Sequence, residues 1–154
     1  MCSSDLDAGV ATVQLRIKPP PGADTRWWQA LRQDLVQAVA LARAAGAHLF
    51  INDHWALARE VGADGVHLGQ EDLQALGEAG RQALLASGLR LGISSHSLWE
   101  LCRARALPAD YLACGPVWPT LTKAMPWRAQ GLDNLRWWVR HAGRPVVGIG
   151  GLLD

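Results

Sequence analysis

Several features that commonly point to a function are scarce or absent in this sequence. It has three cysteines, Cys2, Cys102 and Cys114, and no CxxC pair. An odd number without that spacing predicts neither a disulfide framework nor a zinc cluster, so we expect reduced, structural thiols. No apolar run reaches the roughly 18 residues of a membrane helix, and the chain does not open with a basic segment followed by an apolar stretch. We therefore expect a cytoplasmic protein without a membrane partner.

A surplus of positive charge is also missing. The formal net charge is +1, and the cations are spread along the chain without the basic stripe that nucleic-acid binding normally leaves. One Tyr and one Phe stand beside eight Trp. Tryptophans could stack on sugars or bases, but their pairs fall in helical patterns, which favours packing of helices on a sheet. Nucleic acid is thus not expected as a partner.

The hydrophobic pattern that is present indicates one α/β domain. The 154 residues are 49% hydrophobic and 19% charged, which suits a single folded core. Short β-like runs alternate with helical patterns, which predicts βαβ units and a parallel sheet. The predicted strands are residues 12–17, 48–51, 65–68, 90–93, 110–114 and 145–149. Periodicity leaves open whether the sheet is doubly wound or closes into a barrel, and in both cases ligands bind at the carboxyl ends of the strands.

Capping signals place the helices. The first helix is predicted to begin near Asp24 and to end at Gly46. Its apolar stripe is Trp28, Leu31, Leu35, Val39 and Ala42. Ser97 and Glu100 have the spacing of a capping box, so another helix is expected to begin there.

The last predicted helix spans residues 132–141 and follows a long segment without a clear period. Its expected inner face consists of Leu135, Trp138 and Val139. Residues 115–131 contain three prolines and fit neither a helix nor a strand. Long irregular loops in compact domains are usually functional, so we expect this loop to contribute to a site.

Cations follow several of the predicted strand ends. Arg16 and Lys18 are two residues apart on the first predicted strand, so their side chains would leave one face and could clamp a phosphate. Lys123, beside two hydroxyls, could bind another phosphate. Each of the three alone is as well explained as a solvated surface cation.

Two carboxylates follow consecutive strands. In a barrel Asp53 and Asp72 would be neighbours on the rim, which suits Mg²⁺ bound by one or two carboxylates together with substrate phosphates. Each Asp also precedes a short helical pattern and could be a helix cap. A general acid/base pair is a further alternative. Because a cationic clamp is expected nearby, metal binding is the favoured interpretation.

Other motifs carry less information. Gly148, Gly150 and Gly151 end a strand, where backbone N–H groups could approach a phosphate. The cluster lacks GxGxxG spacing, and the chain has no GxxxxGK[ST] loop, so neither a dinucleotide nor an ATP site is predicted. His67 and His96 have no metal-spaced partner, and we expect both to be hydrogen-bonded structural residues.

Five blocks of this sequence resemble the thiamine phosphate synthase family. In chain order they are VQLRIK, FINDHWALAREVGADGVHLGQEDL, GISSHS, DYLACGPVWPTLTK and VVGIGG. Each block is modestly specific, and five in the family's order are strongly specific. The resemblance implies a TIM-type (β/α)8 barrel with a Mg²⁺ cofactor. It also implies a transferase that joins hydroxymethylpyrimidine diphosphate to hydroxyethylthiazole phosphate, giving thiamine phosphate and pyrophosphate.

The resemblance further implies roles for individual residues. Asp53 and Asp72 match the metal ligands. The pyrimidine diphosphate site is matched by Gln14, Leu15, Arg16, Ile17, Lys18, Asn52, Ser94 and Lys123, and the thiazole phosphate site by Thr120, Leu121, Thr122 and Gly151. The implied reaction is dissociative, so Arg16, Lys18, Ser94 and Lys123 are expected to act by holding and neutralising the departing pyrophosphate rather than by moving protons.

The match has two departures. The family has one strand before VQLRIK and another after the IGG segment, whereas residues 1–9 contain no strand-like run and the chain stops at Asp154. We therefore assign residues 1–9 as an unmatched segment and residues 10–154 as six of eight barrel strands, and we expect this chain alone to be inactive. Alternatives are a thiazole tautomerase-like isomerase and a non-catalytic barrel module fused to a partner domain. The oligomeric state stays open.

Overall fold

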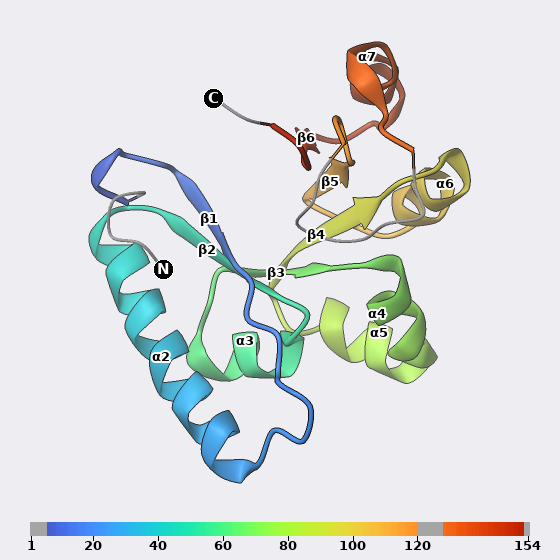
Figure 1. The fold of residues 1–154 in the computed structure, drawn as a ribbon. Helices are drawn as coiled ribbons and strands as arrows, with labels where there is room; N and C mark the ends of the chain where they lie inside the picture. The colour runs from blue at the N-terminus through green and yellow to red at the C-terminus, as the bar shows by residue number, and fades with distance from the viewer. Residues whose placement is uncertain (1–5, 120–127, 153–154) are drawn as a thin grey trace. The chain divides into compact units, whose positions relative to one another are not determined.

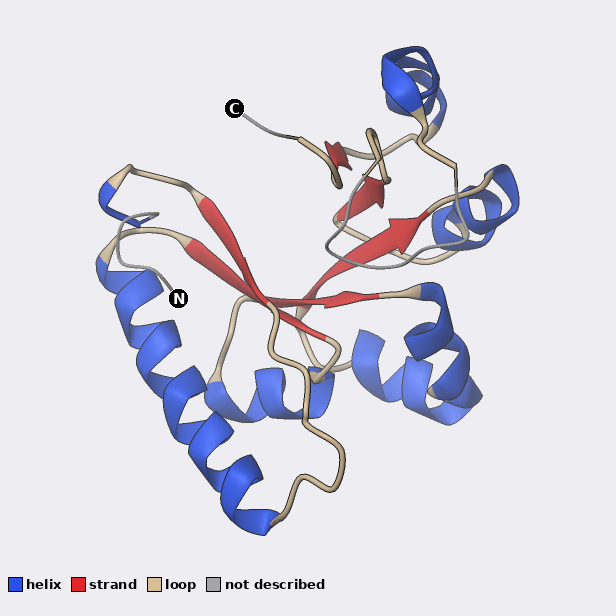
Figure 2. Ribbon diagram, in the orientation of Figure 1, coloured by secondary structure: helices blue, strands red, loops and turns tan. Residues whose placement is uncertain are grey.

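The residues that the structure describes form an α/β fold with six parallel strands, as the sequence pattern predicts (Figures 1 and 2). The structure is a computed structural model that describes residues 6–119 and 128–152. The chain divides into two compact units. Unit 1 comprises residues 1–67 and 77–90, and unit 2 comprises residues 68–76 and 91–154.

Unit 1 is built on parallel strands that lie in chain order. Its elements are β1 (Thr12–Leu15), α2 (Thr25–Ala44), β2 (His48–Asn52), α3 (Trp55–Val61), β3 (Gly65–Leu68, of which Leu68 falls in unit 2) and α5 (Gly77–Leu85). Strand β1 pairs with β2 up to Leu15 and Ile51, and Ile51 pairs in turn with Val66 of β3. Helices α2 and α3 both contact β2. The core of unit 1 therefore lies between this helix pair and the strands.

The signals at the two ends of α2 are confirmed, but one end of its predicted apolar stripe is wrong. Asp24 is the N-cap, and its Oδ1 accepts a hydrogen bond from the Trp27 backbone N at 2.9 Å. The helix ends before Gly46, whose φ of +69° suits glycine. The buried face is Leu31, Leu35, Ala38, Val39 and Ala42. Trp28 is 38% exposed, because the buried part of the helix begins at Leu31 and does not include the first turn.

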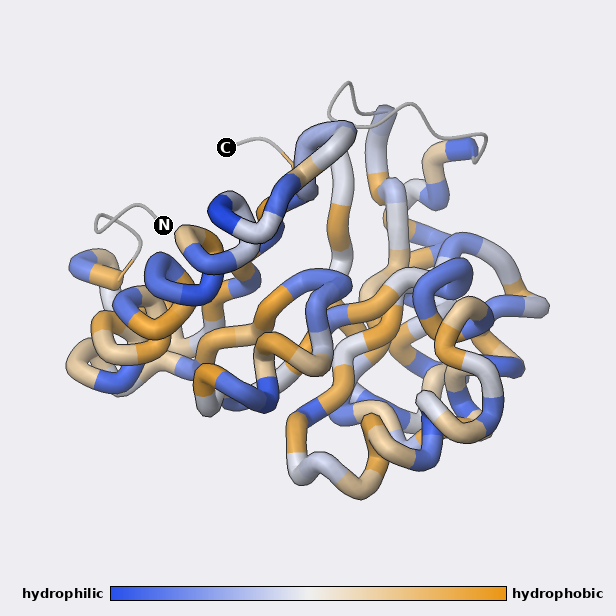
Figure 3. Tube along the Cα trace, turned by 90° about the horizontal axis from the view of Figure 1, so that it is seen from below, coloured by the Kyte–Doolittle hydropathy of each residue, from blue (hydrophilic) through white to orange (hydrophobic). Residues whose placement is uncertain are grey.

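Unit 2 also contains parallel strands in chain order. Its elements are α4 (Gln70–Ala75), β4 (Arg90–Ser95, of which Arg90 falls in unit 1), α6 (Leu98–Arg105), β5 (Tyr111–Cys114), α7 (Gly131–His141) and β6 (Val146–Gly148). Strand β5 pairs with β4 and with β6. Hydrophobic and hydrophilic stretches are interspersed along the helical parts of the chain (Figure 3), as in helices that bury one face.

The predicted packing of tryptophans and of α7 is confirmed only in part. Trp138 is 2% exposed and is the buried anchor of α7, whereas Val139 is 58% exposed and does not lie on an inner face. Trp99 is 71% exposed, so packing does not account for every tryptophan. Helix α7 contacts β6, and Leu135 is half-buried beside Gly148 of that strand, so the predicted inner face is confirmed for Leu135 and Trp138.

The thiols of the described residues are unpaired, as expected. Cys102 is exposed and Cys114 is buried, and neither forms a disulfide. Burial raises the pKa of the Cys114 thiol to about 11, so it stays protonated near neutral pH. None of the described helices has both the length and the apolarity needed to cross a membrane.

Candidate active site

In unit 1, two of the predicted substrate-binding residues are joined at neighbouring strand ends. Gln14 on β1 donates a hydrogen bond through Nε2 to Oδ1 of Asn52 on β2, over 2.7 Å. Asn52 is 7% exposed, whereas Gln14 is exposed. A buried carboxamide needs partners for its polar atoms, and Gln14 satisfies the Asn52 oxygen. The structure thus brings together two residues that the sequence placed on separate strands.

The carboxylate that follows β2 is held by a predicted phosphate-binding lysine. Nζ of Lys18 donates to Oδ2 of Asp53, whose side chain is 14% exposed while that of Lys18 is 53% exposed. Asp53 has a φ of +68°, a conformation that Asn and Asp adopt more readily than most residues. Its backbone N donates to the His67 carbonyl at 3.0 Å. An anion and a cation therefore meet at this strand end.

The prediction that Arg16 and Lys18 lie on a strand is wrong. Strand β1 ends at Leu15, where its pairing with β2 stops, and three prolines from Pro19 onward cannot donate to a sheet. The rule that side chains two residues apart on a strand point to the same face therefore does not apply to Arg16 and Lys18. Lys18 approaches Asp53 from the loop, and the carbonyl of Ile17 lies 3.1 Å from Nε2 of His54.

His67, on β3, is buried beside this site. Burial lowers the pKa of its imidazole to about 4, and the negative charge of Asp53 opposes that shift. The ring is therefore neutral near pH 7. A buried, neutral imidazole agrees with the expected structural role.

In unit 2, Asp72 has the capping role that the sequence left open. Its Oδ2 accepts a hydrogen bond from the Gly69 backbone N at 3.1 Å, within a capping box at the start of α4. Asp53 differs, because the N-cap of α3 is His54. Asp53 belongs to unit 1 and Asp72 to unit 2, so their joint binding of one metal ion stays a prediction.

The segment from Ser94 to His96 comprises the last two residues of β4 and the residue after it, and side chains from other elements hold it. Gln70 donates to the Ser94 carbonyl at 2.9 Å, and Gln130 donates to the His96 carbonyl at 2.8 Å. Ser97 caps α6 as predicted, while Glu100 reaches the backbone N of His96, at 2.6 Å. His96 Nδ1 also lies 3.0 Å from Glu100 Oε2, in line with its expected hydrogen-bonded role.

The glycine cluster after β6 packs on the chain that follows β5. The backbone N atoms of Val117 and Trp118 donate to the carbonyls of Ile149 and Gly150, at 2.8 and 3.0 Å. Gly151 has a φ of +70°, and a Cβ there would lie 2.6 Å from the Trp118 carbonyl oxygen. Thr120, Leu121, Thr122 and Lys123 lie outside the described residues.

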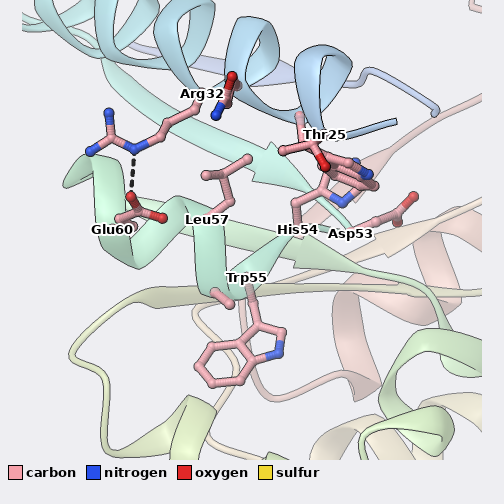
Figure 4. A pocket seen from close by; sticks show the side chains of 10 residues that line it. Thr25, Arg32, Asp53, His54, Trp55, Leu57 and Glu60 are labelled. Atoms are coloured by element: carbon pink, nitrogen blue, oxygen red, sulfur yellow. Dashed lines mark hydrogen bonds and ion pairs between the residues drawn. The ribbon is translucent and has the colours of Figure 1, made fainter. Parts of the chain in front are cut away.

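A cavity of about 490 Å³ lies in unit 1 between α2 and α3 (Figure 4). Asp53 and His54 border it at one end, and at the other Arg32 reaches from α2 to pair with Glu60 on α3. Leu57 contributes an apolar wall. Among the described residues no group of three or more His, Cys, Asp or Glu side chains is arranged to hold a metal ion.

Comparison with known proteins gives the family. A family model described as thiamine monophosphate synthase matches residues 2–153. The chain belongs to this family. It is 47% identical over 148 residues to the thiamine-phosphate synthase of Neisseria meningitidis (strain Z2491), covering 96% of this chain and 68% of that protein. It is 50% identical over 151 residues to the enzyme of the same name from Shigella dysenteriae, covering 96% and 66%.

A solved structure extends this similarity to the fold. The thiamine phosphate pyrophosphorylase from Pyrococcus furiosus matches with a TM-score of 0.76 and 37% identity, over 97% of this chain and 67% of that chain. The chain thus spans about two thirds of the length of these thiamine monophosphate synthase family members. The family suggested by the sequence blocks is confirmed.

Gln70 and Gln130, which hold the Ser94–His96 segment, were not predicted as site residues from the sequence. Gln70 lies two residues after the end of β3, and polar residues at strand ends are candidates for a site, so the sequence could have indicated it. Gln130 lies 34 residues from His96 in sequence, and no local pattern points to their contact.

We expect Gly151→Ala to destabilise the protein by about 2 kcal/mol or more. The alanine would have to adopt the left-handed φ of Gly151. Its Cβ would also lie 2.6 and 2.7 Å from the carbonyl oxygens of Trp118 and Pro119. Gly143→Ala is the matched control. Its φ is +67°, and the nearest atom to a new Cβ is an Arg105 nitrogen at 3.9 Å, so about 1 kcal/mol is expected. Urea unfolding of both variants measures the difference, and equal losses would contradict the close-contact argument.

Proposed function

We propose that the protein is a Mg²⁺-dependent thiamine phosphate synthase that acts in the cytoplasm on hydroxymethylpyrimidine diphosphate and hydroxyethylthiazole phosphate, releasing pyrophosphate. The observation that carries this proposal is 47–50% identity, over 96% of the chain, to relatives named thiamine-phosphate synthase. We further propose that residues 10–154 supply six strands of an eight-stranded TIM-type barrel, which the similarity to the Pyrococcus furiosus structure supports.

The donor atoms of Asp53 and Asp72 suit the proposed metal. Mg²⁺ prefers hard oxygen ligands and usually binds through one or two carboxylates, with phosphates and water completing its shell. When bound, it would supply positive charge to the diphosphate oxygens. The Lys18–Asp53 ion pair supports a role for this strand end in binding a metal–diphosphate, since it already holds an anion and a cation together.

The chain's own residues would bind and neutralise the leaving group. Lys18, Arg16, Ser94 and Lys123 are proposed to contact the diphosphate, with Gln14, Leu15, Ile17 and Asn52 shaping the pyrimidine site. Thr120, Leu121, Thr122 and Gly151 are proposed for the thiazole phosphate. As the pyrophosphate departs, negative charge builds on its oxygens, and fixed cations stabilise it without a proton transfer.

The proposal predicts rescue of a bacterium that lacks thiamine phosphate synthase. The full-length gene should restore growth without added thiamine, because the host supplies both substrates and only the coupling step is missing. A gene carrying Ser94→Ala and Lys18→Ala together is the control for expression without activity. If cells carrying the wild-type gene still needed added thiamine, even when supplied with the thiazole and pyrimidine precursors, the result would favour the isomerase or binding-module alternatives.

A further inference from the structure

Gln70 connects the start of α4 to the end of β4. Its Nε2 donates hydrogen bonds to the Ser94 carbonyl at 2.9 Å and to Oγ of Ser95 at 3.3 Å. A carbonyl oxygen can only accept, so the orientation of the Gln70 carboxamide is fixed by its partner. Ser95 is fully buried, and Ser94 is half-buried beside it. The backbone at Ser94 is thereby tied to an element 24 residues earlier in the chain.

Gln130 holds the same segment two residues further along the chain. Its Nε2 donates to the His96 carbonyl at 2.8 Å, and Nδ2 of Asn134 donates to its Oε1. The backbone N of Gln130 donates to the Pro116 carbonyl at 2.7 Å. Both polar ends of the Gln130 side chain are therefore engaged, which fixes the direction of the bond to His96.

We propose that Gln70 and Gln130 are positioning residues for Ser94, holding the backbone at Ser94 itself and two residues later, at His96, so that the Ser94 hydroxyl meets the diphosphate. This inference rests on the proposed function of Ser94. A side chain on a strand end can shift by an ångström when its backbone is released, and such a shift can cost about 10²-fold in rate. The two carboxamides restrain Ser94 before the ligand arrives, so less order has to be gained on binding.

A purely structural role is the competing explanation, since buried backbone carbonyls need partners whatever the function. The two explanations differ in how the effects combine. If Gln70 acts through Ser94, its loss should matter little once the Ser94 hydroxyl is gone. If Gln70 only stabilises the fold, the two losses should add.

The test is a double-mutant cycle on the full-length protein with Gln70→Met, Ser94→Ala and the double variant. Methionine keeps the length of the side chain without its hydrogen bonds, so the fold is retained. The probe is Mg²⁺–pyrophosphate, and its affinity is measured by calorimetry. We expect Gln70→Met and Ser94→Ala each to weaken binding about 10-fold, and the double variant to be no weaker than Ser94→Ala. Gln130→Ala should behave as Gln70→Met does. Gln74→Ala, on the exposed side of the same helix, is the control and should bind as the wild type does.

Additive losses, or wild-type affinity in Gln70→Met and Gln130→Ala, would overturn the inference, as would a wild type that does not bind pyrophosphate. A parallel assay for thiamine phosphate separates the two proposals. If the affinity losses are coupled but the wild type forms no thiamine phosphate, the positioning role stands and the proposed synthase activity is refuted. If the wild type forms thiamine phosphate but the affinity losses are additive, the synthase activity stands and the positioning role is refuted.

Discussion

Replacing Asp53 by Asn should lower turnover of the full-length protein by about 10²-fold or more while its fold stays intact. Asn has the same shape as Asp and tolerates the φ of +68° at this position, so the backbone has no reason to move. The charge is lost, and with it the carboxylate proposed to bind Mg²⁺. The Mg²⁺ concentration that gives half-maximal rate should rise in a steady-state assay.

Stability distinguishes this catalytic loss from unfolding. The Lys18–Asp53 pair is partly exposed, with the Lys18 side chain 53% accessible, so its loss should cost about 1 kcal/mol at most. Asp24→Asn is a suitable control, because Asn serves equally well as the N-cap of α2. An Asp53→Asn enzyme with wild-type turnover and Mg²⁺ dependence would refute the metal assignment.

Asp72→Asn provides a comparison within the same assay. Asp72 also accepts a hydrogen bond from Gly69 in the capping box of α4, so part of its loss should appear as stability, about 0.5–2 kcal/mol. A variant that loses stability but keeps its Mg²⁺ dependence would leave Asp72 with the capping role alone.

Replacing Lys123 by Ala should also lower turnover by about 10²-fold or more, with little change in stability. A point charge in a closed site of low dielectric constant can stabilise a developing anion by several kcal/mol. Lys123→Arg keeps the charge and should retain more activity than Lys123→Ala. The measurement is steady-state formation of thiamine phosphate together with thermal unfolding.

Lysine labelling offers an independent check on the same residue. The sequence contains two lysines, Lys18 and Lys123, and both are proposed to contact the diphosphate. Reductive methylation followed by mass spectrometry of the peptides should therefore show protection of both by Mg²⁺ and the pyrimidine diphosphate. Unprotected labelling of Lys123, with wild-type turnover in Lys123→Ala, would return it to the solvated surface.

Local signals predicted the elements well because they act within a few residues. Asp24 and Gly46 bracket α2 through capping and a left-handed φ, and both are properties of single residues. Ser97 caps α6 for the same reason. Helical periodicity is weaker, because it defines an arc but not its ends, and Trp28 and Val139 therefore proved exposed.

The site was harder to predict because its contacts are not local. The prediction that Gln14 and Asn52 lie close together is confirmed, because neighbouring parallel strands bring their carboxyl ends to one edge of the sheet. The pairing of Lys18 with Asp53 depends on where β1 stops, and that is decided by its partner strand. The bond from Gln130 to His96 spans 34 residues and has no sequence period.

The measurement that tests the central claim most directly is product formation by the purified full-length protein. Both substrates are supplied with Mg²⁺ or with a chelator, and thiamine phosphate and pyrophosphate are quantified together. We predict equal amounts of the two products, formed only when both substrates and Mg²⁺ are present. No thiamine phosphate with Mg²⁺, or undiminished formation in the chelator, would contradict the proposed Mg²⁺-dependent synthase.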